Sequence, residues 1–293
     1  MARHTRHSID EFGLPIELVE QHAPVVLFDK VWLSFDEKVI LKDVTFDVRS
    51  GHTKIFLGAS GAGKSTILKL MLGLLRPDSG TVWVLGHRVD SMTEEQLMGV
   101  RHHMGMVFQE GALFDSITVG ENVGFKLYEE TDMALDEVRR RVEEVLGFVG
   151  LAEHIDKMPS DLSGGQRRRV GIARAMASKP QLLLFDDPIT GLDPLIATTI
   201  DDEIVKLRDL EDVTTFVVTH QIRDAFYIAE HTAEMVNGKI EVVKKDSSQV
   251  TGVCFMVLHE GAIMFQGTAS ELLAARERDP YLKEYLYKTL PPW

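Results

Sequence analysis

The sequence predicts an α/β fold with a mainly parallel central sheet, and two observations carry this prediction. An apolar run at residues 54–57 enters a glycine-rich segment, 58–66, and then a stretch with helical apolar spacing that ends near Leu75. This succession describes a strand, a tight turn and a helix that faces a sheet. The runs 182–185 and 215–218 are continuously apolar, which is typical of parallel strands covered by helices on both faces.

The other elements follow in chain order. Residues 1–23 are polar and are predicted to form an N-terminal tail. Short runs rich in Val, Phe and Trp predict further strands at 25–28, 41–48 and 81–85. Residues from about 115 to 178 have mainly helical spacing, and the charged side chains of 136–149 are expected on a solvated face.

The composition is that of a globular protein, with 44% hydrophobic and 26% charged residues and a formal net charge of -13. The acidic total argues against a nucleic-acid-binding role, because such proteins usually carry a basic face. Cys254 is the only cysteine, which excludes a disulfide framework within the chain and fits the cytosol. No apolar run approaches the ~20 residues that span a bilayer, and the polar N-terminus does not resemble a signal peptide. A role at a membrane would therefore require another chain that crosses it.

Residues 58–65 read Gly-x4-Gly-Lys-Ser, directly between the predicted strand and the predicted helix. Glycines let backbone N–H groups approach phosphate oxygens closely, and the N-terminus of the helix adds a positive dipole end. We expect Lys64 to bridge the β- and γ-phosphates and the Ser65 hydroxyl to be a ligand of Mg²⁺. The pattern predicts a site for ATP, with Mg²⁺ as its cofactor.

Three further polar residues follow buried strands. Asp186 ends the run 182–185 and is expected to hold Mg²⁺, while Asp187 is the candidate to orient or deprotonate the attacking water. His220 follows the run 215–218 and should also reach the γ-phosphate. All three would lie at one edge of the sheet, beside the glycine-rich turn.

Together with the motif Leu-Ser-Gly-Gly-Gln at 162–166, these residues resemble the ATP-binding subunit of an ABC transporter. The resemblance covers about residues 25–275. It implies a P-loop NTPase of ABC type, with an antiparallel β subdomain and a helical signature subdomain at about 115–178. The resulting domain layout is a tail at 1–23, an ATPase domain at 24–275 and an aromatic C-terminal tail at 276–293.

The resemblance also assigns roles to single residues. Gln109 would sense Mg²⁺ and the attacking water, Phe35 would stack on adenine, and Asp193 would couple the two sites of a dimer. The residues implied to bind ATP are Phe35, Gly58, Ser60, Gly61, Ala62, Gly63, Lys64, Ser65 and Thr66. The implied ligands of Mg²⁺ are Ser65, Gln109 and Asp186, and the implied catalytic residues are Lys64, Gln109, Asp187 and His220.

In this family the signature contacts the γ-phosphate that the other subunit holds. Ser163, Gly164, Gly165 and Gln166 would therefore act in trans, and each chain has one phosphate site and one signature. The implied partners are a second copy of the chain and integral membrane permease subunits, with no nucleic acid. The implied location is the cytoplasmic face of the inner membrane.

Residues 111–125, GALFDSITVGENVGF, are similar to the groove region of ATPases of the Mla type, which serve MCE-protein lipid transporters. This similarity implies phospholipid trafficking and an MCE-type lipid-binding partner. An importer ATPase for another solute remains an alternative. A soluble ABC-type protein acting on DNA or ribosomes is disfavoured, because the chain has no long coiled coil, zinc cysteines or second ATP domain.

Several features depart from the family pattern or leave alternatives open. Position 187 usually carries Glu, and the shorter Asp would slow hydrolysis unless the backbone compensates; a binding module with crippled hydrolysis is the corresponding alternative. Residues 238–257 are expected to add an extended β-hairpin, with Asn237-Gly238 as its turn. Arg167, Arg168 and Arg169 are expected to be solvated at the start of a helix. The tyrosines of 276–293 would either dock on another chain or fold back on the domain.

Overall fold

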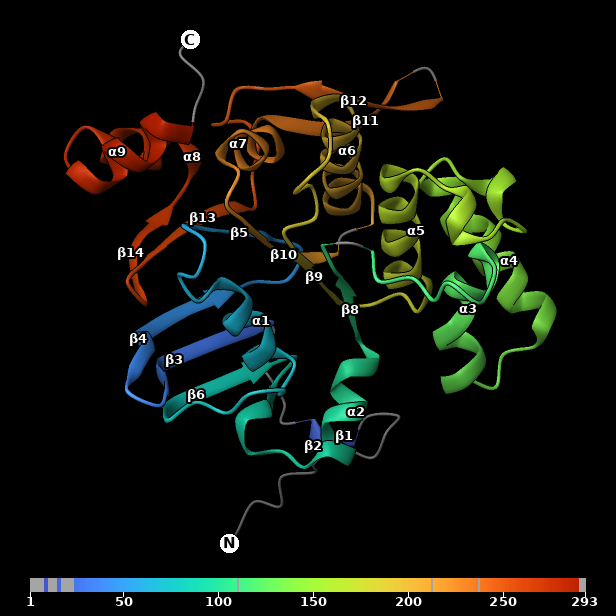
Figure 1. Cartoon of the computed structure of the whole chain (residues 1–293), viewed down its shortest axis with the longest axis horizontal. Helices are drawn as coiled ribbons and strands as arrows, with labels where there is room; N and C mark the ends of the chain where they lie inside the picture. The colour runs from blue at the N-terminus through green and yellow to red at the C-terminus, as the bar shows by residue number, and fades with distance from the viewer. Residues whose placement is uncertain are drawn as a thin grey trace, which may run out of the picture.

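The computed structural model contains two main sheets with helices packed around them (Figure 1). It describes residues 8–9, 15–16, 24–109, 111–211, 213–236 and 238–289. The predicted N-terminal tail lies outside the described residues except for a pair of two-residue strands, β1 (Ser8–Ile9) and β2 (Pro15–Ile16).

The larger sheet has six strands in the order β14-β13-β5-β10-β9-β8. Their bounds are Thr53–Gly58 (β5), Met104–Val107 (β8), Leu182–Asp186 (β9), Thr214–Thr219 (β10), Val253–His259 (β13) and Ala262–Gly267 (β14). Every neighbouring pair is parallel except β13 and β14, so the predicted mainly parallel sheet is confirmed. In the pairing register Val218 lies opposite both Phe56 and Asp186, and the carboxyl ends of β5, β9 and β10 meet at one edge.

A smaller antiparallel sheet packs beside it in the order β4-β3-β6-β7. Its strands are β3 (Val26–Phe35), β4 (Lys38–Val48), β6 (Ser79–Val84) and β7 (His87–Arg88). Helix α1 (Lys64–Met71) lies between the two sheets (Figure 1). Four aromatic rings, with centroids 4.6 to 5.9 Å apart, join the sheets through the core: Phe28, Phe46, Phe56 and Phe216.

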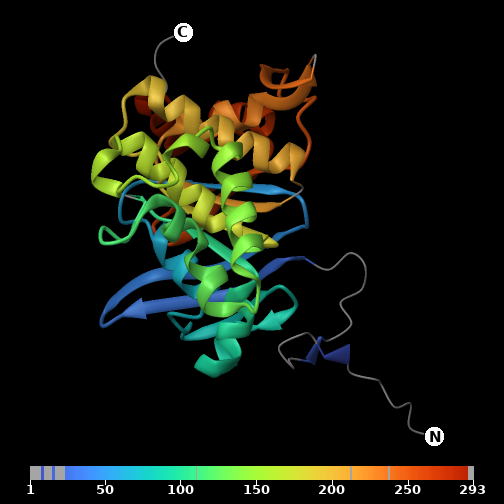
Figure 2. The ribbon, with the colours of Figure 1, turned by 90° about the vertical axis from the view of Figure 1, so that its right-hand side faces the viewer.

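Helices α3 (Val119–Glu130), α4 (Leu135–Phe148) and α5 (Gly164–Ala177) form the predicted helical region, which faces the viewer in Figure 2. Buried Val138, Val142 and Val145 line one side of α4, as its apolar spacing predicts. Most of its charged side chains are exposed, but the expectation of a solvated face was wrong for Arg141, which is half-buried and donates hydrogen bonds to the carbonyl oxygens of Met176 and Ala177. The other helices of the main body are α2 (Glu94–His102), α6 (Pro194–Leu210) and α7 (Ile222–Glu230), with 3-10 turns at Val89–Ser91, Ala152–His154 and Pro159–Asp161.

The added hairpin lies earlier in the chain than the expected 238–257. It is formed by β11 (His231–Val236) and β12 (Lys239–Lys244), which pair antiparallel and pack beside α6. Gly238, with φ 76°, lies in the turn, and Asn237 is outside the described residues. Residues 253–257 belong instead to β13, because their continuous apolar run is buried in the central sheet against β5.

The segment after β14 forms two helices, α8 (Ala269–Arg276) and α9 (Pro280–Thr289). Helix α9 folds back on the domain, since Leu282 and Leu286 are buried in the main core. Among the two open alternatives for the aromatic segment, the structure favours packing on its own chain, although Tyr287 remains 83% exposed. Within the described chain, no helix combines the length and the apolar character needed to cross a bilayer.

Candidate functional site

The turn between β5 and α1 has the form of a phosphate-binding loop. Gly63 precedes α1 with φ 102°, a left-handed conformation that suits glycine. A Cβ at this position would lie 3.1 Å from the Leu41 side chain and 3.2 Å from the Ile40 carbonyl oxygen. The buried Lys64 donates hydrogen bonds from Nζ to the carbonyl oxygens of Gly58 (2.8 Å) and Ala59 (3.0 Å). The lysine therefore spans the loop and holds its ammonium group inside the turn.

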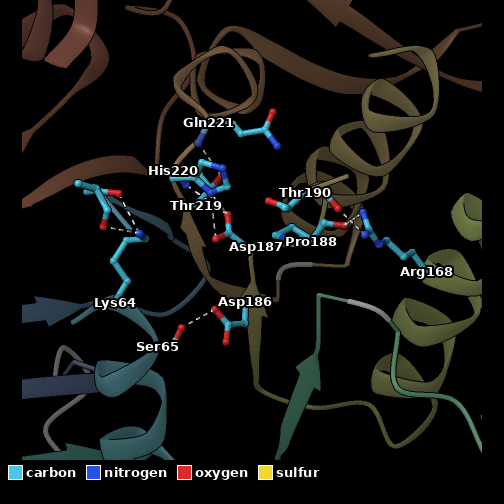
Figure 3. Close-up of polar contacts among 12 residues, drawn as sticks. Lys64, Ser65, Arg168, Asp186, Asp187, Pro188, Thr190, Thr219, His220 and Gln221 are labelled. Carbon is cyan, nitrogen blue, oxygen red and sulfur yellow. Dashed lines mark hydrogen bonds and ion pairs between the residues drawn. The ribbon is translucent and has the colours of Figure 1, made fainter. Parts of the chain in front are cut away.

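Ser65 and Asp186 meet across the sheet edge, on α1 and at the end of β9. The Ser65 Oγ donates to an Asp186 carboxylate oxygen at 3.0 Å (Figure 3). Because both groups offer hard oxygens, the pair fits Mg²⁺, which prefers a few protein oxygens together with phosphate and water. The fit rests on Ser65 and Asp186, which lie together despite a separation of 121 residues in the chain.

Asp187 and His220 form a second contact, directly beside the first (Figure 3). The two carboxylate oxygens of Asp187 lie 2.9 and 3.1 Å from His220 Nδ1, and one of them also accepts a hydrogen bond from the His220 backbone N–H at 3.2 Å. Asp187 has φ 49°, in the left-handed region that Asp and Asn adopt more readily than other side chains that carry a Cβ. The backbone thus turns the carboxylate of position 187 toward His220.

The electrostatics of the site reflect its partial burial. Burial lowers the pKa of Lys64, and the charges of Asp187 and Asp186 oppose this shift. Burial likewise raises the pKa of Asp186, an effect that the hydrogen bond from Ser65 counters. A triphosphate with Mg²⁺ would add charges of both signs here, which suits a site that already holds one cation and two carboxylates.

The remaining residues expected at the nucleotide lie around this centre. Phe35 ends β3 and is 46% exposed, so its ring is available for stacking. Gln109 follows β8 and is exposed. Ser60 and Gly61 are exposed in the loop. These residues are therefore accessible to a ligand.

The signature lies at the start of α5. The Ser163 hydroxyl accepts a hydrogen bond from the Gln166 backbone N–H (3.2 Å), and the Gln166 side chain accepts one from the Ser163 N–H (2.8 Å). This reciprocal capping leaves the hydroxyl proton of the exposed Ser163 free to donate. Of the contacts described for residues 58–66 and 163–166, none joins one group to the other. In a single copy the signature is therefore separate from the phosphate loop.

Arg168 occupies a position that the sequence pattern did not predict. The arginine run was expected to be solvated, yet Arg168 is only 8% exposed. Its guanidinium donates hydrogen bonds to the carbonyl oxygens of Pro188 and Thr190 (Figure 3). The expectation was wrong for Arg168 because the turn after Asp187 presents carbonyl oxygens that need a buried donor. Arg167 and Arg169 are also half-buried and donate to the carbonyl oxygens of Leu162 and Val149.

The same turn leads to Asp193, which is the N-cap of α6. Its carboxylate accepts hydrogen bonds from the backbone N–H groups of Leu195 (3.0 Å) and Ile196 (3.1 Å). Ile196 in turn packs against Gly165 of the signature, where a Cβ would lie 2.2 Å from the Ile196 side chain. The signature, the turn at 188–190 and the start of α6 are therefore in direct contact.

These features define a P-loop nucleotide-binding protein, with a strand–glycine loop–helix unit, a carboxylate pair at the adjacent strand end and a histidine on the next strand. Comparison with known families is more specific. Residues 41–190 match the family model described as ABC transporter, and the chain belongs to that family and carries its ATPase domain.

Two curated relatives and one solved structure illustrate the similarity. Protein TRIGALACTOSYLDIACYLGLYCEROL 3 of Arabidopsis thaliana is 40% identical over 227 residues, covering 72% of this chain and 65% of the relative. The methionine import ATP-binding protein MetN of Bifidobacterium longum is 38% identical over 224 residues, covering 74% of this chain and 56% of the relative. The similarity thus spans less than two thirds of each of these relatives.

The solved structure is a dimeric post-hydrolysis state of the ATP-binding cassette MJ0796, bound to ADP and Pi. It superposes with a TM-score of 0.68 at 28% sequence identity, covering 83% of this chain and 98% of the other. The shared architecture includes the α/β fold and extends over nearly the whole cassette.

Proposed function

We propose that this chain hydrolyses ATP between two copies of itself and thereby drives an ABC transporter. The observation that carries the proposal is the meeting of Lys64, Ser65, Asp186, Asp187 and His220 at one edge of the central sheet. These residues supply a cation that can contact the phosphates, two ligands for a metal ion, a carboxylate that can act as a base, and a histidine. Phosphoryl transfer to water needs groups of these kinds.

Each residue has a role that its position supports. Lys64 would contact the β- and γ-phosphates, while Ser60, Gly61, Ala62, Gly63 and Thr66 surround them with backbone and hydroxyl donors. Phe35 would stack on the adenine. Ser65, Asp186 and Gln109 would hold Mg²⁺, which when bound neutralises charge on the phosphates. Asp187 would orient and deprotonate water, and His220, held by Asp187, would contact the γ-phosphate.

The signature supplies the reason for a dimer. Ser163 retains a free hydroxyl proton and lies at a helix N-terminus, which attracts anions. Gly164, Gly165 and Gln166 accompany it, and Asp193 lies beside them on α6. In two copies arranged head to tail, each signature would close the phosphate site of the other copy. The dimeric state of the similar MJ0796 cassette supports the pairing of two copies.

A groove beside β8 is suited to a membrane subunit. Met106, Phe108, Phe114, Phe125, Ala175 and Arg174 contribute to its lining. Phe114 and Phe125 pack with centroids 4.8 Å apart, and both rings are partly exposed. An apolar groove of this kind receives an amphipathic helix. We place integral membrane permease subunits there, which would hold the chain at the cytoplasmic face of the inner membrane.

Phospholipid is the transported class that we favour, in a system with an MCE-type lipid-binding protein. The sequence of 111–125 supports this choice. The name of the Arabidopsis relative is that of a glycosylated diacylglycerol, which supports a glycerolipid as the transported class. The second candidate is import of another solute, favoured by the similarity to a methionine import protein. The acidic net charge of -13 supports neither DNA nor RNA as a partner.

Two experiments test the proposal. Affinity purification from membranes in mild detergent should recover permease chains, an MCE-type protein and bound phospholipid; recovery of a different solute-binding protein would favour the second candidate. In the purified assembly, Ser163→Arg should abolish ATP turnover but leave ATP binding intact. Ser270→Arg, an exposed site on α8, is the matched control and should retain full turnover. Unchanged turnover in Ser163→Arg would contradict the two-copy site.

A further inference from the structure

The amide group of Gln166 contacts two different residues. Its oxygen, Oε1, accepts a hydrogen bond from the Ser163 backbone N–H at 2.8 Å and so contributes to the cap of α5. Its nitrogen, Nε2, lies 3.2 Å from the Nε2 nitrogen of His154, a residue twelve positions earlier in the chain and outside the signature. Gln166 therefore links the signature serine to this histidine.

The protonation of His154 follows from these two contacts. A backbone N–H only donates, so the amide atom of Gln166 that faces Ser163 is the oxygen, and the group that faces His154 is the NH2. Because this NH2 also only donates, Nε2 of His154 accepts and carries no proton. The ring is then the neutral tautomer with its proton on Nδ1.

The other side of the ring agrees with this tautomer. A carboxylate oxygen of the exposed Glu153 lies 3.8 Å from Nδ1 of His154. Within the part of the chain that the structure describes, Nδ1 makes no hydrogen bond. The negative charge of Glu153 favours the proton at this nitrogen over the opposite one, which leaves Nε2 free to accept from Gln166.

The backbone holds His154 in place. The residue is 8% exposed and ends the 3-10 turn at Ala152–His154. Its backbone N–H donates to the Leu151 carbonyl oxygen at 2.9 Å, and its own carbonyl oxygen accepts from the Lys157 N–H at 3.0 Å. Because the turn is closed on both sides of the histidine, the imidazole presents its acceptor nitrogen from a fixed backbone.

Two helices hold the same segment from outside. Arg169 of α5 donates to the Val149 carbonyl oxygen at 3.0 Å, just before the turn. The Ile155 carbonyl oxygen, just after His154, accepts a hydrogen bond of 2.8 Å from the Gly120 N–H at the start of α3. The place of His154 relative to the signature is therefore set by bonds that do not involve Gln166.

Removal of the acceptor would release the amide group of Gln166. The amide would then be free to rotate, and its NH2 group would no longer be directed away from the Ser163 N–H. In the rotated state two donors would face each other, and the Ser163 N–H would lose its acceptor. The reciprocal cap that orients the Ser163 side chain would open. The histidine thus selects the amide orientation that the signature needs.

We propose that His154 is a positioning residue for the signature: by accepting from the Gln166 amide, it keeps the Ser163 hydroxyl oriented to donate to the γ-phosphate of the partner copy. The proposal rests on the two-copy hydrolytic function proposed above, and it adds a residue from outside the motif. It implies an effect on the closing of the two-copy site and none on the first binding of ATP at Lys64.

The test uses two variants of the full chain in its membrane assembly. His154→Phe keeps a flat ring but has no acceptor. His154→Gln restores an acceptor, because the amide oxygen of Gln lies as many bonds from the backbone as Nε2 of His. We expect His154→Phe to lower kcat for ATP about 10-fold with ATP binding changed less than about 2-fold, and His154→Gln to restore most of the lost rate. His52→Phe, at an exposed site before β5, is the matched control and should equal wild type.

Two further readouts do not depend on turnover. NMR of the chain with isotope-labelled histidine, at about pH 8 so that the ring is neutral, should show a protonated Nδ1 and an unprotonated Nε2 for His154. The His154 signals are assigned by their absence from His154→Gln. Hydrogen exchange of the backbone N–H groups of 163–166 should be faster in His154→Phe than in wild type or His154→Gln, because the cap is loosened.

Several results would overturn the proposal. They are a proton on Nε2 of His154, unchanged exchange at 163–166, a kcat of His154→Phe equal to wild type, and an equal loss of rate in the Phe and Gln variants. A fall in kcat with a Tm lowered by more than about 4 °C would mark a folding defect and would also overturn it. If the wild-type assembly does not hydrolyse ATP, the proposed function is wrong and the role of His154 in turnover falls with it, whereas the tautomer and the exchange rates still decide whether His154 holds Gln166.

Discussion

Replacing Asp187 by Asn is the perturbation that separates hydrolysis from binding most cleanly. Asn is nearly isosteric and adopts the left-handed conformation at φ 49° as readily as Asp. Its amide oxygen can still accept the hydrogen bond from the His220 backbone. We therefore expect the change in unfolding free energy to stay below about 1 kcal/mol, so that an effect on rate is not an effect on folding.

The expected fall in the hydrolysis rate follows from the role proposed for Asp187. A positioned general base contributes about 10²- to 10⁴-fold, and a 10³-fold loss corresponds to about 4 kcal/mol in the barrier. The assay is phosphate release by the assembly at saturating Mg-ATP, with nucleotide affinity measured separately. We expect kcat to fall by roughly this factor while ATP affinity is retained. Because the Asp187→Asn variant should keep ATP bound without hydrolysing it, its monomer–dimer equilibrium should also shift toward the dimer.

Asp187→Glu is the companion variant, because its carboxylate reaches one methylene farther from the same backbone. Glu is less favoured in the left-handed region, at a cost of about 1 kcal/mol in stability, but it should retain turnover. If Asp187→Asn hydrolyses ATP as fast as wild type, Asp187 is not the base, and the chemical part of the proposal is wrong.

Three further predictions follow from the same geometry. Gly63→Ala should weaken ATP binding at least about 10-fold, because a Cβ at φ 102° strains the loop and meets its neighbours. Nucleotide titration measures the affinity, and an affinity equal to wild type would contradict the assignment of residues 58–65 as a phosphate-binding loop. Arg168→Ala should lower Tm and slow turnover by leaving two carbonyl oxygens of 188–190 without their donor. Unchanged calorimetry and turnover would show that Arg168 does not fix this turn. Burial and the charge of Asp224 raise the pKa of Asp201 well above its usual value, so the folded state binds a proton that the unfolded state releases, and stability falls as pH rises from about 4 through the folded pKa. Asp201→Asn should therefore be more stable than wild type at pH 8 in denaturant titrations, with a difference that shrinks toward pH 4; an equal pH dependence would contradict this reasoning.

The sequence predicted those parts of the site whose pattern lies within one short, continuous segment of the chain. Residues 58–65 combine a strand end, glycines and a helix start in one continuous segment, so the turn follows from the residues themselves. Asp186 and His220 were placed correctly at the sheet edge because continuous apolar runs identify strands buried on both faces, and parallel strands end on the same side. The central sheet was predictable for the same reason.

The parts that sequence reasoning missed depend on contacts between distant segments. Arg168 has the same local pattern as a solvated charge, and only the fold brings the carbonyl oxygens of 188–190 to it. The hairpin was placed too late because an apolar run at 253–257 reads equally as an added strand or as a strand of the main sheet, and pairing with β5 decides.

The contacts around Arg168 also suggest how an event at one site would reach the other copy. Arg168 on α5 holds the turn at 188–190, which follows Asp187 directly. Asp193 continues from that turn into α6, and Ile196 of α6 packs against Gly165. The signature residues, which are proposed to contact the partner's nucleotide, are therefore fixed through hydrogen bonds and close packing to the segment that follows the proposed base, Asp187, of their own site. Movement of Asp187 during hydrolysis would be transmitted to the signature, because Arg168 holds the segment 188–196 near its start and Ile196 packs against Gly165 at its end. A solvated Arg168 would make no contact with this segment and could not link the two.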